Sequence, residues 1–79
     1  MKEKIRHFIV ENFLFGEREL KDDESLFESG IIDSLGLIKL IAFIDEKFKV
    51  SIDMSEIMIE NFNTLNDIME TLKSKGSPS

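Results

Sequence analysis

Apolar residues recur at intervals of three and four along the first segment of the chain, with charged residues between them. These apolar positions are Ile5, Phe8, Ile9 and Phe13. The spacing places them on one face of a helix, so it predicts a helix over residues 2–14. Gly16 follows shortly afterwards, where a glycine often ends a helix because it tolerates a left-handed backbone.

Charged residues without a sustained period fill most of residues 16–32, which predicts a long first loop. Within this loop, Ser25-Leu-Phe-Glu28 fits a capping box that can start one short helical turn. We expect the two apolar residues of that box, Leu26 and Phe27, to hold the loop against the core. Gly30 suits a backbone turn just before the next helix.

A second helix is predicted from about Asp33 to Phe48, because Asp is a favoured N-cap residue and apolar residues again follow the helical period. This assignment leaves Ser34 in the first helical turn. At about 100° per residue, one sector of the helix holds the positions expected to face the core. They are Leu37, Leu40, Ile41, Ile44 and Phe48.

A second apolar stripe on the same helix consists of Leu35, Ile38 and Ala42, which fall in a different sector. One face of a helix in so small a bundle must meet water, so we expect this stripe to be exposed. Phe43 is expected either to be exposed or to pack on the first loop. Contiguous exposed apolar surface usually marks a contact with another molecule. We therefore predict a partner-docking face, made of Leu35, Ile38, Lys39, Ala42, Asp45 and Glu46.

The rest of the chain predicts an extended link, a short third helix over residues 55–60 with Ser55 as a candidate cap, and a last helix ending near Leu72. Thr64-Leu-Asn-Asp67 resembles a capping box at the start of the last helix. The buried stripe of that helix is Leu65, Ile68, Met69 and Leu72. No segment alternates with the strand period of two. The predicted fold class is therefore all-α, a four-helix bundle with three main helices, a short third helix and a long first loop.

The length of 79 residues predicts one small domain, which we place at residues 1–73, followed by a flexible polar tail over residues 74–79. The formal net charge of −6 argues against nucleic-acid binding and favours basic partner proteins.

The absence of Cys and the single His argue against disulfides and a metal site. No apolar run is long enough to span a membrane, and the first residues lack the pattern of a signal peptide. We expect a cytoplasmic monomer.

Three roles can be weighed for Ser34. A hydrolytic nucleophile needs a base and an oxyanion hole, and the only candidate base, His7, lies on the polar side of the first predicted helix. A purely structural role at the helix start is already filled by Asp33. An attachment point is the third role, because the free N–H groups and positive dipole end of a helix N-terminus favour a phosphate ester.

The residues around Ser34 then resemble a known family. Gly30-Ile-Ile-Asp33-Ser34-Leu35, followed by Leu40 and by Glu46-Lys-Phe48, resembles the phosphopantetheine attachment site of acyl carrier and peptidyl carrier proteins. Ile52 and Asn61-Phe-Asn-Thr-Leu65 are similar to later positions of the same pattern. The resemblance covers essentially residues 2–73.

This resemblance implies an acyl-carrier-like bundle that is not an enzyme. Ser34 would receive 4′-phosphopantetheine from coenzyme A through a phosphopantetheinyl transferase, with Asp33 and Leu35 beside it. The thiol of that arm would hold an acyl group as a thioester, which also accounts for a chain without Cys. Acyl or aminoacyl ligases, synthases and acyltransferases would be its partners on the docking face of the second helix.

Two positions depart from the pattern of housekeeping fatty-acid carriers, in which acidic residues are common at the corresponding places. Gly36 stands in the first turn at a helix cost of roughly 1 kcal/mol relative to Ala, and Lys39 reverses the charge within the docking face. They favour a specialised stand-alone acyl carrier, serving a pathway such as lipid modification, polyketide or amino-acid loading. An aminoacyl or peptidyl carrier remains an alternative, as does an unmodified helical interaction module. The cargo cannot be assigned, although Met54, Met58 and Met69 would suit either an adaptable cavity or plain core packing.

Overall fold

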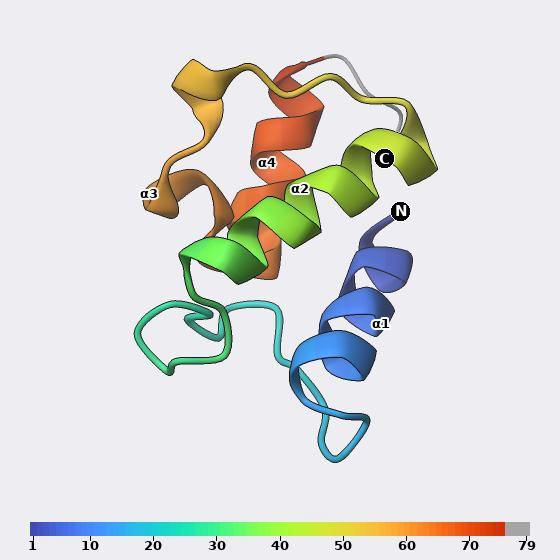
Figure 1. Ribbon diagram of the computed structural model, residues 1–79, viewed down its shortest axis with the longest axis vertical. Coiled ribbons are helices and arrows are strands. Elements are labelled where there is room, and N and C mark those ends of the chain that lie inside the picture. Colours follow the sequence, from blue (N-terminus) through green and yellow to red (C-terminus); the bar gives the residue numbers. More distant parts are fainter. Residues whose placement is uncertain (76–79) are drawn as a thin grey trace.

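The computed structural model describes residues 1–75 and, within them, four α-helices and no strand. The helices are α1 (Lys2–Phe13), α2 (Ser34–Phe48), α3 (Ile59–Phe62) and α4 (Leu65–Ser74), with the 3-10 turn η1 (Met54–Glu56) before α3. Figure 1 shows α2 crossing in front of α4, with α1 beside it and the long first loop below the start of α2. The predicted all-α four-helix bundle is confirmed.

The core forms where the apolar faces of α1, α2 and α4 meet, and loop residues complete it. Its buried members are Ile5, Ile9, Leu20, Leu26, Ile32, Leu37, Leu40, Ile44, Val50, Phe62, Leu65, Ile68 and Leu72. All three helical stripes predicted from periodicity contribute to this set. Leu26 is fully buried, as expected of a residue that holds the loop against the core. Leu20, Ile32, Val50 and Phe62 join the core from outside the predicted stripes.

Aromatic residues line the seam between α1 and α2. Phe43 of α2 stacks on Phe8 of α1 at 4.1 Å between ring centroids, and Phe13 meets Phe8 edge-on at 6.1 Å. The expectation that Phe43 is exposed or packs on the first loop is therefore wrong. Phe43 is half-buried against the neighbouring helix, because its place on α2 faces the side where α1 lies.

The third predicted helix is the main local error. In place of one helix over 55–60 capped by Ser55, the chain forms η1 and then the separate one-turn helix α3. Asp53 caps η1 in a capping box with Glu56, which satisfies backbone N–H groups two residues earlier than Ser55 would. Extended backbone at Met58 then separates the two turns.

The C-terminal boundary also differs from the prediction. The helix α4 continues through Ser74, and the Lys75 side chain donates to Glu56 at 2.6 Å. The rest of the predicted tail, residues 76–79, lies outside the described residues. The predicted capping box of this helix is half present, since Thr64 Oγ1 accepts from the Asp67 backbone N–H at 3.0 Å. In the described part of the chain, no helix has the length and apolarity to cross a membrane.

Candidate functional site: the start of α2

Ser34 is the first residue of α2, and its side chain is exposed. None of the side-chain hydrogen bonds found within residues 1–75 involves its hydroxyl group, whereas the loop serine Ser25 uses its hydroxyl to bond Asn63. The structure therefore presents a free primary hydroxyl at the N-terminus of the longest helix. The N-terminal end of a helix carries partial positive charge, which favours a phosphate ester on such a hydroxyl.

Asp33 caps this helix from the position before Ser34. Its backbone is extended, with φ −105° and ψ −172°, and its Oδ1 accepts from the backbone N–H of Gly36 at 2.8 Å. Its carbonyl oxygen accepts the Leu37 N–H at 2.9 Å, so the helical hydrogen bonds begin here. The predicted N-cap role of Asp33 is confirmed. The carboxylate also remains exposed beside Ser34.

Backbone hydrogen bonds hold the segment that leads into the site. The Ile32 N–H donates to the Leu26 carbonyl at 2.9 Å, and the Leu26 N–H donates to the Asn63 carbonyl at 2.7 Å. Both Ile32 and Leu26 are buried. Gly30, with φ +79°, makes the turn between them that most other residues would enter only with strain. The site is thus anchored through the loop to the junction of α3 and α4.

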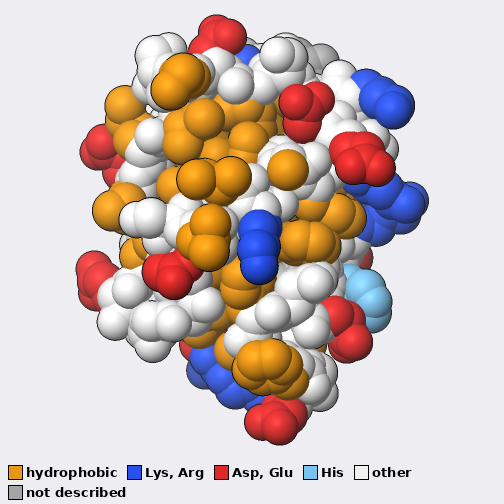
Figure 2. Space-filling view, viewed as in Figure 1, with side chains coloured by type: hydrophobic (Ala, Val, Ile, Leu, Met, Phe, Trp, Pro, Cys, Tyr) orange, Lys and Arg blue, Asp and Glu red, His pale blue; other side chains and the backbone are white. Residues whose placement is uncertain are grey.

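All six residues of the predicted docking face lie at the surface of α2. Leu35 and Ile38 each expose 62% of their surface, which is high for large apolar side chains. Figure 2, which looks onto α2, shows apolar side chains gathered on this face with basic surface among them. The exposure predicted for this stripe is confirmed, while its use by partners stays a prediction.

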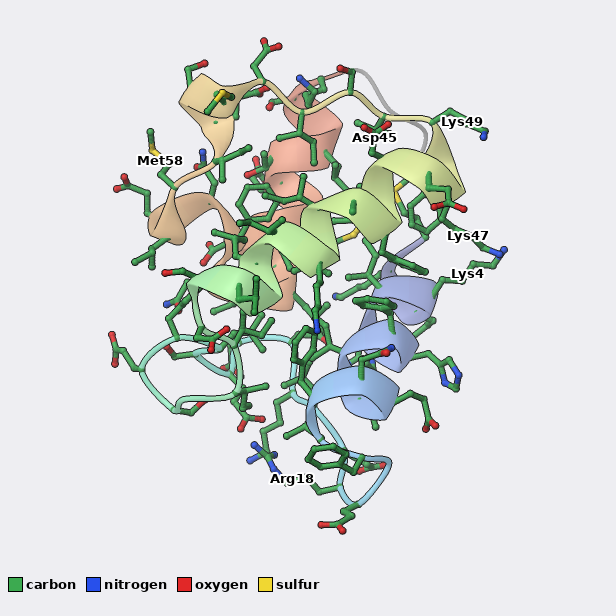
Figure 3. All side chains as sticks on the ribbon, in the orientation of Figure 1. Lys4, Arg18, Asp45, Lys47, Lys49 and Met58 are labelled. Atoms are coloured by element: carbon green, nitrogen blue, oxygen red, sulfur yellow. The ribbon has the colours of Figure 1, made fainter. Side chains whose placement is uncertain are left out.

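Four exposed apolar residues beyond α2 were not predicted, and one of them is Phe15, which exposes 78% of its surface. Met54 exposes 87% of its surface, Ile59 58% and Met58 42%, so the interpretation of Met54 and Met58 as cavity or core residues is wrong. Figure 3 shows Met58 pointing away from the bundle between η1 and α3. The third residue of that interpretation, Met69, does pack, partly buried, against the core. Residues 54–59 show no sustained helical period, and this was the signal that could have revealed their exposure. The prediction of one continuous helix over residues 55–60 overlooked it.

His7 lies apart from Ser34. It is exposed in a groove between α1 and the later part of α2, which is lined among others by Lys4, Phe8 and Lys47. Figure 3 shows Lys4 and Lys47 pointing outward on that same side of the molecule. Ser34 is not among the residues of this groove, and none of the hydrogen bonds within residues 1–75 joins its hydroxyl to His7. Within residues 1–75, no cluster of acidic or histidine side chains is placed to bind a metal ion.

Comparisons with known proteins agree with this geometry. Residues 3–72 match the family described as "Phosphopantetheine attachment site". A D-alanyl carrier protein of Streptococcus suis is 36% identical over 69 residues, which are 87% of this chain and 86% of that protein. The D-alanyl carrier protein of Streptococcus uberis is 36% identical over 73 residues, 92% of this chain and 91% of its own. A third, from Streptococcus sanguinis, is 31% identical over 89% of this chain and 87% of its own length.

Proposed function

This chain belongs to the phosphopantetheine attachment family of carrier proteins, and we propose on that premise that it is a stand-alone aminoacyl carrier whose cargo is D-alanine. Covalent 4′-phosphopantetheine is the cofactor of this family. When attached, the arm supplies the thiol that holds the cargo as a thioester. The proposal prefers the aminoacyl alternative to a fatty-acyl carrier, because the relatives that align over nine-tenths of the chain are D-alanyl carriers.

Ser34 is the proposed attachment residue, and its exposed, unengaged hydroxyl is the observation that carries the proposal. A group of this size on Ser34 would project into solvent without displacing core side chains. Asp33 keeps the helix start in place and offers its charge to the transferase. Leu35 gives that enzyme an exposed apolar contact next to the modified residue.

The partners we propose are a phosphopantetheinyl transferase, an ATP-dependent ligase that loads D-alanine, and an acyltransferase that removes it. They would bind the docking face of α2, where apolar Leu35 and Ile38 are flanked by charged side chains. The carrier itself does no chemistry in this scheme. We further propose that residues 1–73 form the carrier domain and that the protein works as a cytoplasmic monomer, which size-exclusion chromatography and cell fractionation will test.

The decisive experiment is an intact mass of the protein after incubation with coenzyme A, magnesium and a broad-specificity phosphopantetheinyl transferase. We expect one phosphopantetheine on the wild type and none on Ser34→Ala. Ser55→Ala, which removes another exposed serine, is the matched control and should be modified like the wild type. An unmodified wild type, shown to be folded by circular dichroism, would refute the carrier proposal.

The cargo is tested separately on the modified protein. With a D-alanine-activating ligase and ATP, we expect labelled D-alanine to become bound and to be released by neutral hydroxylamine, as a thioester is. Labelled L-alanine and a medium-chain fatty acid with its own ligase serve as comparisons. Preferential loading of the fatty acid would return the assignment to an acyl carrier of lipid metabolism.

A further inference from the structure

Gly36 occupies a buried position in the first turn of α2, directly after the exposed pair Ser34 and Leu35. A Cβ atom built on Gly36 would lie 2.9 Å from Cε1 of Phe13, 3.1 Å from Cγ2 of Ile32 and 3.3 Å from Oδ1 of Asp33. All three approaches are closer than ordinary van der Waals contact. The helical backbone here is thus in contact with α1 and with the segment that leads into the site.

Each of these three neighbours is itself held in place. The Phe13 ring is half-buried and packs edge-on against Phe8, so it cannot swing away freely. Ile32 is buried, and its N–H is bonded to Leu26. Oδ1 of Asp33 accepts the N–H of Gly36 itself. Any side chain at position 36 must therefore push on α1, on the approach segment or on the cap of α2.

We propose that Gly36 is a positioning residue for Ser34. Because it has no side chain, the Phe13 ring packs directly onto the first turn of α2, and this contact fixes the turn that presents the serine hydroxyl. The inference rests on the proposed modification of Ser34 and deepens it. The glycine that seemed only to weaken the helix is required by the packing of α1 against the site.

The sign of the stability change tests the packing. Alanine at an unhindered helical position stabilises a helix relative to glycine. If position 36 had room for a side chain, Gly36→Ala would therefore raise Tm. The contacts predict the opposite, a Tm lower by about 4 °C or more. An unchanged or raised Tm would overturn the proposal.

The kinetics of phosphopantetheine transfer test the positioning. For Gly36→Ala, assayed well below its Tm, we expect kcat of the transferase to fall by about tenfold, because a displaced hydroxyl is poorly aligned. KM for the carrier should change by less than about twofold, since the docking face of α2 is untouched. Glu70→Gly on α4 is the control for lost helix stability, because it should lower Tm and leave both constants at wild-type values. If Glu70→Gly slows transfer as much as Gly36→Ala does, the proposal fails.

A double variant identifies the contact that matters. Leucine at position 13 is shorter than the Phe13 ring and removes the closest of the three approaches. Gly36→Ala should therefore slow transfer less in the Phe13→Leu background than in the wild type. If the fold-losses in transfer rate of the two single variants simply multiply in the double variant, the proposal is overturned. The amide of Gly36 gives a second readout that needs no enzyme, because Phe13→Leu should speed its hydrogen exchange. Absence of modification in the wild type would instead refute the proposed function, which separates the two failures.

Discussion

At the scale of single residues, Asp33 and Ser34 are neighbours with different structural tasks. The carboxylate of Asp33 satisfies the Gly36 N–H at the helix start, while the hydroxyl of Ser34 is left free. A helix N-terminus left uncapped would fray, and the serine would then be presented on mobile backbone. The cap thus lets Ser34, the proposed attachment residue, be exposed and ordered at once.

Asp33→Ala removes the cap, and Asp33→Asn keeps a capping oxygen while removing the charge. We expect Asp33→Ala to lower the free energy of unfolding by about 1 kcal/mol and Asp33→Asn to change it by much less. Urea unfolding followed by circular dichroism measures both. If both variants nevertheless slow phosphopantetheine transfer, the charge of Asp33 acts on the transferase. Equal destabilisation by the two variants would contradict the capping role.

At the scale of secondary-structure elements, Asn63 joins the long first loop to the α3–α4 junction. Its Oδ1 accepts from the Ser25 hydroxyl at 2.9 Å and from the Phe27 N–H at 3.3 Å. Its carbonyl accepts the Leu26 N–H at 2.7 Å. One residue, through its side chain and its backbone carbonyl, therefore holds the loop whose far end leads into the proposed attachment site.

Asn63→Ala is expected to cost about 1–3 kcal/mol of unfolding free energy, because it leaves the partly buried Ser25 hydroxyl and Phe27 N–H without their acceptor. The control is Asn12→Ala, which removes an exposed side chain bonded only to the Phe8 carbonyl. That change should stay within about 0.5 kcal/mol. Chemical denaturation compares the two, and equal small losses would show that the loop does not depend on Asn63.

The docking face of α2 carries Lys39 in the stripe that is otherwise apolar and acidic. Lys39→Glu reverses this charge, so a partner that matches the lysine should bind the variant less well. We expect KM of the cognate aminoacyl ligase for the carrier to rise several-fold and turnover by a housekeeping fatty-acid synthase to improve. Steady-state assays with the two enzymes measure this, and unchanged values in both would exclude Lys39 as a specificity element.

At the scale of the whole molecule, Asp22 joins α1, the first loop and α4. Its carboxylate accepts from Lys2 at 2.6 Å and also pairs with Arg6, and its carbonyl accepts the Asn66 N–H at 3.1 Å. Hydrogen bonds from Lys2, and then from Arg6, hold the pKa of Asp22 below its ordinary value. Hydrogen bonds with Glu3, and then with Asp22, raise the pKa of the Arg6 guanidinium.

A depressed carboxyl pKa stabilises the fold at pH values above the ordinary pKa of about 4, and this contribution is lost as pH falls through the lower folded-state pKa. We therefore expect Tm to fall as the pH drops below about 4. Asp22→Asn should lower Tm at pH 7 and flatten the acid limb of the curve. Its control is the exposed neighbour variant Asp23→Asn. A scanning calorimetry series gives all three curves, and identical acid limbs would show that Asp22 does not contribute.

The sequence by itself determined the three main helices, the caps of α2 and α4, and the place of Ser34 at the start of α2. Helical period and capping act over three or four residues, so Asp33, Thr64 and the stripe from Leu37 to Ile44 were readable from neighbours in the chain. The exposed stripe at Leu35 and Ile38 followed in the same way, from the sectors of a single helix. The identity of the cargo was not readable from these local patterns.

Only the tertiary structure decided which surfaces meet between elements. Phe43 stacks on Phe8, Gly36 receives the Phe13 ring, and Met54 and Met58 face solvent. These outcomes depend on how α1, α2 and the η1–α3 segment pack against one another. That packing is determined jointly by residues far apart in the chain. Local spacing treats a glycine in a helix as a weakness. The packing of α1 against α2 makes the same glycine the point where the helix and the attachment site are held.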